Sequence, residues 1–202
     1  MRGHSHNSFR KILVGHDGEA AGQSAAETYE ERSPREGCGD IMSTPFLNQI
    51  NHQVNFHRRL VYKFFIDFSL FEYALKQAGF LLPVPEAKAD WDTFAQSIDA
   101  GFDPNANREI RSAVQYLLNH PPRKQFNNAG VLMFGDTVRP AGCSDTQWLS
   151  VLIRRIRNNS FHGGKFEFDP IRDTRLLNHS LVILEAWAQL HPVVEQALRN
   201  AH

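Results

Sequence analysis

The fold follows from residues 44–79, TPFLNQINHQVNFHRRLVYKFFIDFSLFEYALKQAG. A Ser or Thr cap followed by Pro45 marks a helix start, and Gly79 marks its end. At about 100° per residue, one set of apolar side chains falls on a single stripe of this helix. Its members are Phe56, Leu60, Phe64, Phe68, Phe71, Leu75 and Ala78. We therefore predict a long helix with an aromatic core face, in which Asp67 needs a cationic or hydrogen-bonding partner.

Four more helices are expected downstream, each with its own start and stop signals. They occupy residues 91–98, about 107–119, a stretch that begins at 144 or 145 and runs through Ile156 into residues 157–164, and about 169–191, followed by a closing segment at 193–201. Residues 123–142 form a long connection, in which the apolar piece at 131–134 fits either a strand-like or a helical turn. No convincing hairpin is expected. About five helices predict an all-α fold, a helical bundle.

Residues 1–43 differ from the rest of the chain, because their apolar side chains are few and aperiodic and Gly, Ser, Ala and Glu dominate. Such a stretch buries too little surface to offset the entropy of ordering it. We expect a disordered or loosely attached arm at 1–43 and a single helical domain at 44–202, which agrees with a length of 202 residues.

Composition narrows the class of protein. Lys+Arg and Asp+Glu both number 22, so any nucleic-acid contact needs a local positive cluster. No apolar run approaches the roughly 18 residues of a membrane span, and the start of the chain lacks the apolar segment of a signal peptide. Cys38 and Cys143 lie far apart without metal-ligand spacing. We expect a cytoplasmic protein with no membrane contact, no disulfide framework and no metal site.

Residues 157–162, RNNSFH, are the one stretch that suggests reactivity more than packing. If the helix continues to His162, Asn158 lies one turn before it and can fix the imidazole tautomer. Arg157 lies about 140° away around the axis, but its long side chain can reach the same site. The only local positive cluster placed to neutralise a polyanion comprises Arg154, Arg155, Arg157 and Lys165.

A second face of this helix lies opposite its apolar core stripe of Leu149, Leu152, Ile153 and Ile156. It carries Trp148, Val151, Arg155, Asn158 and His162. A helix that is apolar on one side needs only one core. The second face therefore meets either another subunit or another segment of the same chain.

The stretch from Arg157 to His162 resembles the R-x4-6-H signature of the HEPN superfamily, including the polar residue after Arg and the Gly163-Gly164-Lys165-Phe166 that follows. The segment around Phe68 and Phe71 is similar to the helix that carries a Glu-x3-Lys pair in many HEPN proteins, here Glu72 and Lys76. The resemblance covers the chain from about residue 44 to the C-terminus.

The resemblance implies a helical bundle that forms symmetric dimers, with two motifs facing each other across an interfacial cleft. Active members are metal-independent endoribonucleases, often toxins or defence proteins, and need no cofactor; others keep only a binding role. Arg157 and His162 would be the catalytic pair, Asn158 the orienting residue, and Glu72 and Lys76 supporting residues. RNA would be the substrate, and an antitoxin or defence-system protein would be a further partner.

Elementary chemistry agrees with this implication. Cutting RNA without metal requires a base for the 2′-hydroxyl proton, an acid for the leaving 5′-oxygen, and positive charge on the phosphorane. Histidine suits both proton roles, and a two-fold axis would supply the second His162. The alternative is a non-catalytic module that binds RNA, a nucleotide or a protein partner. Two plainer interpretations are a basic helix C-terminus for the motif and a surface salt bridge for Glu72 and Lys76.

Overall fold

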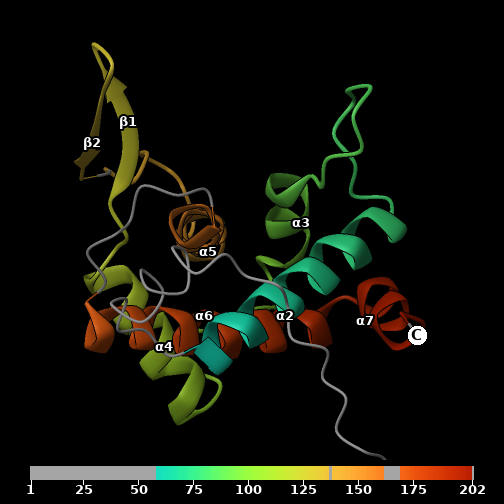
Figure 1. The fold of residues 1–202 in the computed structure, drawn as a ribbon. Helices are drawn as coiled ribbons and strands as arrows, with labels where there is room; N and C mark the ends of the chain where they lie inside the picture. Colours follow the sequence, from blue (N-terminus) through green and yellow to red (C-terminus); the bar gives the residue numbers. More distant parts are fainter. Residues whose placement is uncertain (1–57, 137, 162–168, 202) are drawn as a thin grey trace, which may run out of the picture. The chain divides into compact units, whose positions relative to one another are not determined.

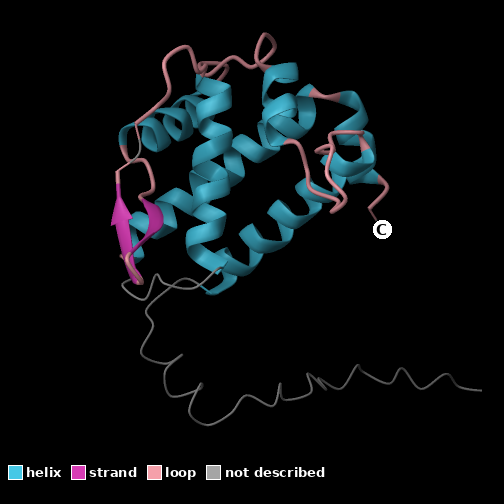
Figure 2. Cartoon of the chain, turned by 90° about the horizontal axis from the view of Figure 1, so that it is seen from above, coloured by secondary structure: helices cyan, strands magenta, loops and turns pink. Residues whose placement is uncertain are grey.

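The computed structural model describes residues 58–136, 138–161 and 169–201. Helices make up 63% of this part of the chain, which also holds one two-stranded sheet (Figures 1 and 2). The chain divides into two units, residues 1–42 and 43–202, and everything described belongs to the second. The expected arm at 1–43 lies outside the described residues. A mostly helical fold is confirmed at the level of fold class.

The described elements follow one another in the order α2, α3, α4, β1, β2, α5, α6 and α7. Their bounds are Arg58–Gln77, Trp91–Ile98, Arg108–Asn119, Lys124–Asn128, Val131–Gly135, Asp145–Phe161, Pro170–Leu190 and Pro192–Arg199. Helix α6 packs against α2, α4 and α7, and α3 packs against α5 (Figure 1). None of the described helices has both the length and the apolarity to cross a membrane.

Helix α2 carries the predicted aromatic face. Phe64, Phe68, Phe71 and Leu75 are all at most 2% exposed, as the stripe predicts. The helix ends where expected: Gly79 has a φ of +89°, and the Phe80 amide donates to the Leu75 carbonyl at 2.9 Å. This is the bonding of a Schellman motif, in which glycine avoids the strain of a left-handed residue. The expected first half of the helix, residues 44–57, lies outside the described residues.

Asp67 finds the cationic partner that its position requires. Lys63, one turn earlier on α2, makes an ion pair with its carboxylate. The Asp67 side chain stays 35% exposed, so the charge sits at the edge of the core face and still reaches water. The pair therefore removes the apparent conflict between a carboxylate and an apolar stripe.

The downstream helices begin at the predicted residues because polar side chains cap their free amides. At the start of α5, the Gln147 amide donates to Ser144 Oγ at 3.2 Å and the Ser144 amide donates to Gln147 Oε1 at 3.0 Å. This reciprocal pair is a capping box and selects Ser144, not Asp145, as the cap. The other side-chain caps are Asp90 for α3, Asn107 for α4 and Asp169 for α6.

The expectation of no hairpin is wrong. Strands β1 and β2 pair antiparallel, with Asn128 opposite Val131. The two-residue turn uses positive φ at both positions, +50° at Ala129 and +86° at Gly130, which defines a type I′ turn. The hairpin could not be predicted from the sequence for two reasons. Ala-Gly is a weaker turn signal than Asn-Gly, and nearly every strand residue is exposed, so no alternation of buried and exposed positions marks the strands.

The C-terminal region follows the prediction with one addition. Helix α6 ends at Leu190, and Pro192 starts a separate helix, α7, which buries Val194. Because the closing segment is helical, the described residues hold six helices where about five were expected.

Candidate functional site

The motif lies at the C-terminal end of α5, and only part of it is described. Arg157 and Asn158 belong to the last turns of the helix, which the structure follows to Phe161. His162 and Lys165, predicted as a catalytic and an RNA-binding residue, lie outside the described residues.

The Arg157 side chain is directed toward α2. Its guanidinium carbon lies 5.8 Å from the centroid of the Phe68 ring, in cation–π contact. One guanidinium nitrogen donates to Asn158 Oδ1 at 3.2 Å. Asn158, the predicted orienting residue, thus contacts Arg157. The Phe68 ring and the Asn158 amide together hold the guanidinium plane of Arg157 in place.

Glu72 belongs to the same neighbourhood through a short chain of contacts. Phe68, under Arg157, stacks on Trp91 of α3 with ring centroids 5.1 Å apart. The Trp91 indole N–H donates to Glu72 Oε1 at 3.0 Å. Because Trp91 is only 2% exposed, this bond holds the half-buried carboxylate in place on α2. Arg157 and Glu72 are therefore the two ends of one continuous contact path.

Lys76 follows Glu72 by one helical turn but does not pair with it. Within residues 58–136 the structure holds no Glu72–Lys76 ion pair, and Glu72 accepts the indole N–H of Trp91. The interpretation of these two residues as a surface salt bridge is not what the structure shows. Lys76 is half-buried at the end of α2, near the helix C-terminus, where its charge is favourable.

Arg154 and Arg155 diverge from each other. Arg154 makes an ion pair with Asp92 of α3 at 2.6 Å, and Asp92 is 71% exposed. Arg155 lies over the Trp148 ring at 5.9 Å and donates to the Pro122 carbonyl at 3.5 Å. Burial lowers the pKa of Arg155, and the nearby charge of Arg154 adds to that effect. These two predicted RNA-binding residues therefore have different partners, although their charges lie near enough to affect each other.

Trp148 and Arg155, on the second face of α5, meet another segment of the same chain. Trp148 is 5% exposed and Val151 packs against the same core. The Arg155 contact to Pro122 shows that the segment before β1 covers this side of the helix. Of the two alternatives left by the sequence, the intramolecular one accounts for these residues.

Asn159 is a structural residue that the sequence reasoning missed. It is 8% exposed, and its amide donates to the Arg123 carbonyl at 2.9 Å. From α6, Arg172 donates to the Pro121 carbonyl at 3.1 Å. These two bonds anchor the segment that leads into the hairpin to α5 and α6. One feature of the sequence could have predicted this role. Arg155 and Asn159 are four residues apart and therefore form a polar pair on one face of a mostly apolar helix.

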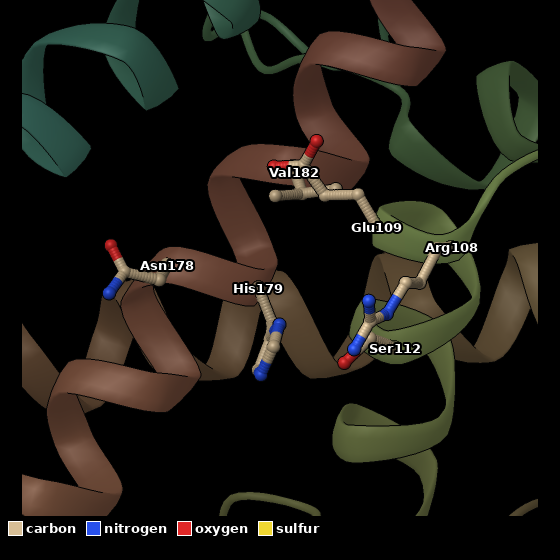
Figure 3. A pocket seen from close by; sticks show the side chains of 6 residues that line it. All are labelled: Arg108, Glu109, Ser112, Asn178, His179 and Val182. Carbon is tan, nitrogen blue, oxygen red and sulfur yellow. The ribbon is translucent and has the colours of Figure 1, made fainter.

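Two adjoining surface pockets lie away from the motif, beside α4 and α6. One, of about 410 Å³, is lined by Arg108, Glu109, Ser112, Asn178, His179 and Val182 (Figure 3). A second, about 340 Å³, shares Glu109 and Val182 with it. Burial, with the Arg175 charge as a smaller cause, lowers the pKa of His179. Asp67, which the sequence analysis singled out, lines the second pocket together with Lys63.

No three His, Cys, Asp or Glu side chains are grouped so that they could hold a metal ion, as far as residues 58–136, 138–161 and 169–201 are concerned. Comparison of the chain with family models, with curated proteins and with solved structures finds no match. The HEPN resemblance thus rests on the motif residues themselves.

Proposed function

We propose that this protein is a metal-independent endoribonuclease of HEPN type, which cuts RNA by attack of the 2′-hydroxyl and leaves a 2′,3′-cyclic phosphate. The observation that carries the proposal is the placement of Arg157. Its guanidinium lies over Phe68, on a contact path that ends at Glu72, and it precedes His162 by five residues.

The roles follow from the chemistry of each group. His162 takes the 2′-hydroxyl proton in one subunit, and the same residue of a second subunit protonates the leaving 5′-oxygen. Arg157 holds the scissile phosphate with its planar fork and stabilises charge on the phosphorane. Asn158 orients the pair, and Glu72 and Lys76 support the site. The proposal therefore includes a homodimer, RNA as substrate, and control by an antitoxin or defence-system protein.

The contacts of the neighbouring arginines support Arg157 as the phosphate ligand. Arg154 is paired with Asp92, and Arg155 packs on Trp148 with its charge partly desolvated. An arginine that already neutralises a carboxylate or holds a backbone carbonyl loses those contacts if it turns to a phosphate. Arg157 has an aromatic ring beneath its guanidinium and the Asn158 amide beside it, and both contacts hold the guanidinium plane in one orientation.

The test is an assay of purified protein with mixed RNA in excess chelator. Wild type is expected to cleave, whereas Arg157→Ala and His162→Ala are expected to lose about 10²-fold or more of the rate. Arg111→Ala is the matched control, since Arg111 is an exposed arginine of α4 that donates to the Asn105 carbonyl at 3.4 Å. Its rate should equal that of wild type. Equal cleavage by wild type and His162→Ala would overturn the proposal.

A non-catalytic binding module is the second candidate. The observation in its favour is that Asp92 neutralises Arg154, which weakens the positive field that an RNA substrate would meet. This candidate predicts that wild type, Arg157→Ala and His162→Ala all fail to cleave, while wild type still retains RNA in a filter-binding measurement.

A further inference from the structure

Helix α2 has a second face rich in aromatic side chains, opposite the one that it buries. At about 100° per residue, this face covers an arc about 140° wide on the side away from Phe64. We call it the outer face of α2. Its members are Arg58, Arg59, Tyr62, Phe65, Ile66, Ser69, Leu70, Tyr73, Lys76 and Gln77. Tyr62 is 69% exposed, Phe65 43%, Leu70 38% and Tyr73 44%, so none of these four belongs to the buried core.

The outer face carries positive charge at both ends and, within Arg58–Gln77, no carboxylate. Arg59 lies near its start and Lys76 near its end, about 25 Å apart along the helix axis. The two acidic residues of α2 lie outside this arc. Asp67 pairs with Lys63, and Glu72 accepts an indole N–H from α3. An occupant that complements the outer face is therefore anionic and also offers flat apolar surface to the aromatic rings.

The outer face adjoins the motif at the end of α5. The Phe65 ring packs against Phe161, with ring centroids 5.2 Å apart, and Phe161 directly precedes His162 in the chain. On the neighbouring side of α2, the Arg157 guanidinium lies over Phe68. A strand that follows the outer face therefore passes beside the residues of the proposed catalytic site.

We propose that the outer face of α2 binds single-stranded nucleic acid. The bases stack on Tyr62, Phe65 and Tyr73. The phosphates meet Arg59 and Lys76 at the two ends. Every base has a flat π-face, so this stacking tolerates any sequence and needs no 2′-hydroxyl. Bases inside a duplex are stacked on one another and do not reach the rings. The inference rests on the proposed function in one respect, since it makes the RNA that the motif cuts single-stranded.

Two other occupants match the outer face less well. A second copy would place cations opposite cations, because the face has no carboxylate to pair with them, and like charges destabilise an interface. A membrane surface favours an uninterrupted apolar face, whereas Ser69 lies in the middle of this one and two of its three rings carry a hydroxyl group. Nucleic acid accepts such a mixed surface, since it stacks on tyrosine rings and hydrogen-bonds to hydroxyl groups.

The experiment measures binding of the full chain to a fluorescent single-stranded oligothymidylate of about 12 nucleotides by anisotropy. This DNA probe has no 2′-hydroxyl, so the proposed cleavage chemistry cannot act on it and binding is measured by itself. Tyr62→Ala and Tyr73→Ala are each expected to weaken binding about fivefold or more, whereas Tyr62→Phe and Tyr73→Phe keep the ring and should retain it. The same oligonucleotide annealed to its complement should bind much more weakly than the single strand.

Phe126→Ala is the matched control, since Phe126 of β1 is 42% exposed, nearly as much as Tyr73, and it should bind as wild type does. Circular dichroism of each variant checks that the helices remain folded. The proposal is overturned if wild type does not bind the single strand at about 100 µM protein, the weak end of non-specific affinities. Equal binding by wild type and both alanine variants, or equal affinity for single strand and duplex, would also overturn it.

Anionic lipid vesicles test the membrane alternative. Wild type that binds these vesicles through the two tyrosines, and does not bind the oligonucleotide, would assign the outer face to a membrane. Cleavage of RNA is a separate readout. If the oligothymidylate binds through the tyrosines while RNA is not cut, the outer face stands and the nuclease proposal fails. If RNA is cut while Tyr62→Ala and Tyr73→Ala bind as wild type does, the nuclease proposal stands and the outer-face proposal fails.

Discussion

Asn158 and Asn159 are consecutive asparagines with opposite surroundings. Asn158 is exposed and contacts Arg157, whereas Asn159 is 8% exposed and holds the Arg123 carbonyl. Sequence reasoning selected Asn158 from the motif and overlooked Asn159, because the residue that Asn159 binds lies 36 positions away. A motif shows which residues share a chemistry, but it does not show which of them a distant loop will bury.

Removal of the Asn159 amide should cost more stability than removal of the Asn158 amide. Asn159→Ala removes a hydrogen bond made by a side chain that is only 8% exposed, so we expect the free energy of unfolding to fall by about 0.5–1.5 kcal/mol. Asn158→Ala, as the adjacent control, should change it by less than about 0.5 kcal/mol. Urea unfolding followed by circular dichroism measures both values, and equal losses would show that the Asn159–Arg123 bond is not stabilising.

His179 should make the fold less stable in acid. Because burial lowers its pKa in the folded protein below the ordinary 6.5, the unfolded chain binds the proton more readily as the pH falls. Stability contributed by neutral His179 is therefore fully present above about pH 6.5 and is lost as the pH drops toward the folded pKa. His179→Gln should be less sensitive to pH across that window when unfolding is measured at pH 7 and pH 5.

The Arg175 charge is the second cause of the lowered His179 pKa. In an NMR titration of the His179 ring, Arg175→Gln should move that pKa upward, toward the ordinary value, but not fully to it, since burial remains. A pKa that does not move in Arg175→Gln would mean that burial alone lowers it.

At the level of elements, the helices were predictable and the hairpin was not. Helix α3 spans Trp91–Ile98 as predicted, because a cap and an amphipathic pattern coincide within one short segment. Strands β1 and β2 contain ten residues, of which eight are exposed. Hydrophobic periodicity reports burial, so an element that is exposed on both faces leaves no periodic signal for sequence reasoning to detect.

The turn of the hairpin should respond in opposite directions at its two positions. Gly130→Ala forces a side chain into a φ of +86° and should destabilise the hairpin by about 1–2 kcal/mol, with no steric clash because nothing lies within 4 Å. Ala129→Gly relieves the same strain at a φ of +50° and should stabilise the hairpin. Amide hydrogen exchange of β1 and β2 measures both effects. Slower exchange in Gly130→Ala would contradict the type I′ assignment.

The start of α3 gives a test of capping. Asp90 Oδ1 accepts the Thr93 amide at 3.0 Å, and this hydrogen bond is the largest cause of the lowered Asp90 pKa. Asp90→Ala should lower the free energy of unfolding by about 0.5–2 kcal/mol, whereas Asp90→Asn keeps the acceptor and should lose little. Thermal unfolding distinguishes them. Because the carboxylate form is favoured in the fold, its contribution should be present above the ordinary pKa of 3.8 and be lost as the pH falls below it.

At the scale of the whole molecule, the helical domain brings together residues that the sequence separates by more than eighty positions. Glu72 and Arg157 came from two different motifs, and the structure connects them through Phe68 and Trp91. The sequence predicted the helices that carry both residues and the aromatic face between them. It could not predict that Trp91, whose indole N–H holds Glu72, supplies the link, because helix packing depends on contacts between distant segments.

The partners of Arg154 and Arg155 are a second case in which the sequence could not predict tertiary contacts. Sequence proximity suggested one positive patch, but consecutive helical residues point about 100° apart. Arg154 therefore reaches α3 and Arg155 reaches the segment before β1. The charge pattern of a sequence indicates where cations are, and tertiary contacts decide which of them remain available to a polyanion.

The central claim is that this chain cuts RNA through the 2′-hydroxyl, without metal. Its most direct measurement compares a synthetic RNA oligonucleotide that contains a mapped cleavage position with the same oligonucleotide carrying 2′-deoxyribose at that one position, both in excess chelator. The account predicts that only the all-ribose strand is cut, with a 2′,3′-cyclic phosphate at the new end, and that His162→Ala cuts neither. Cleavage of the deoxy-substituted strand at the same bond would contradict it.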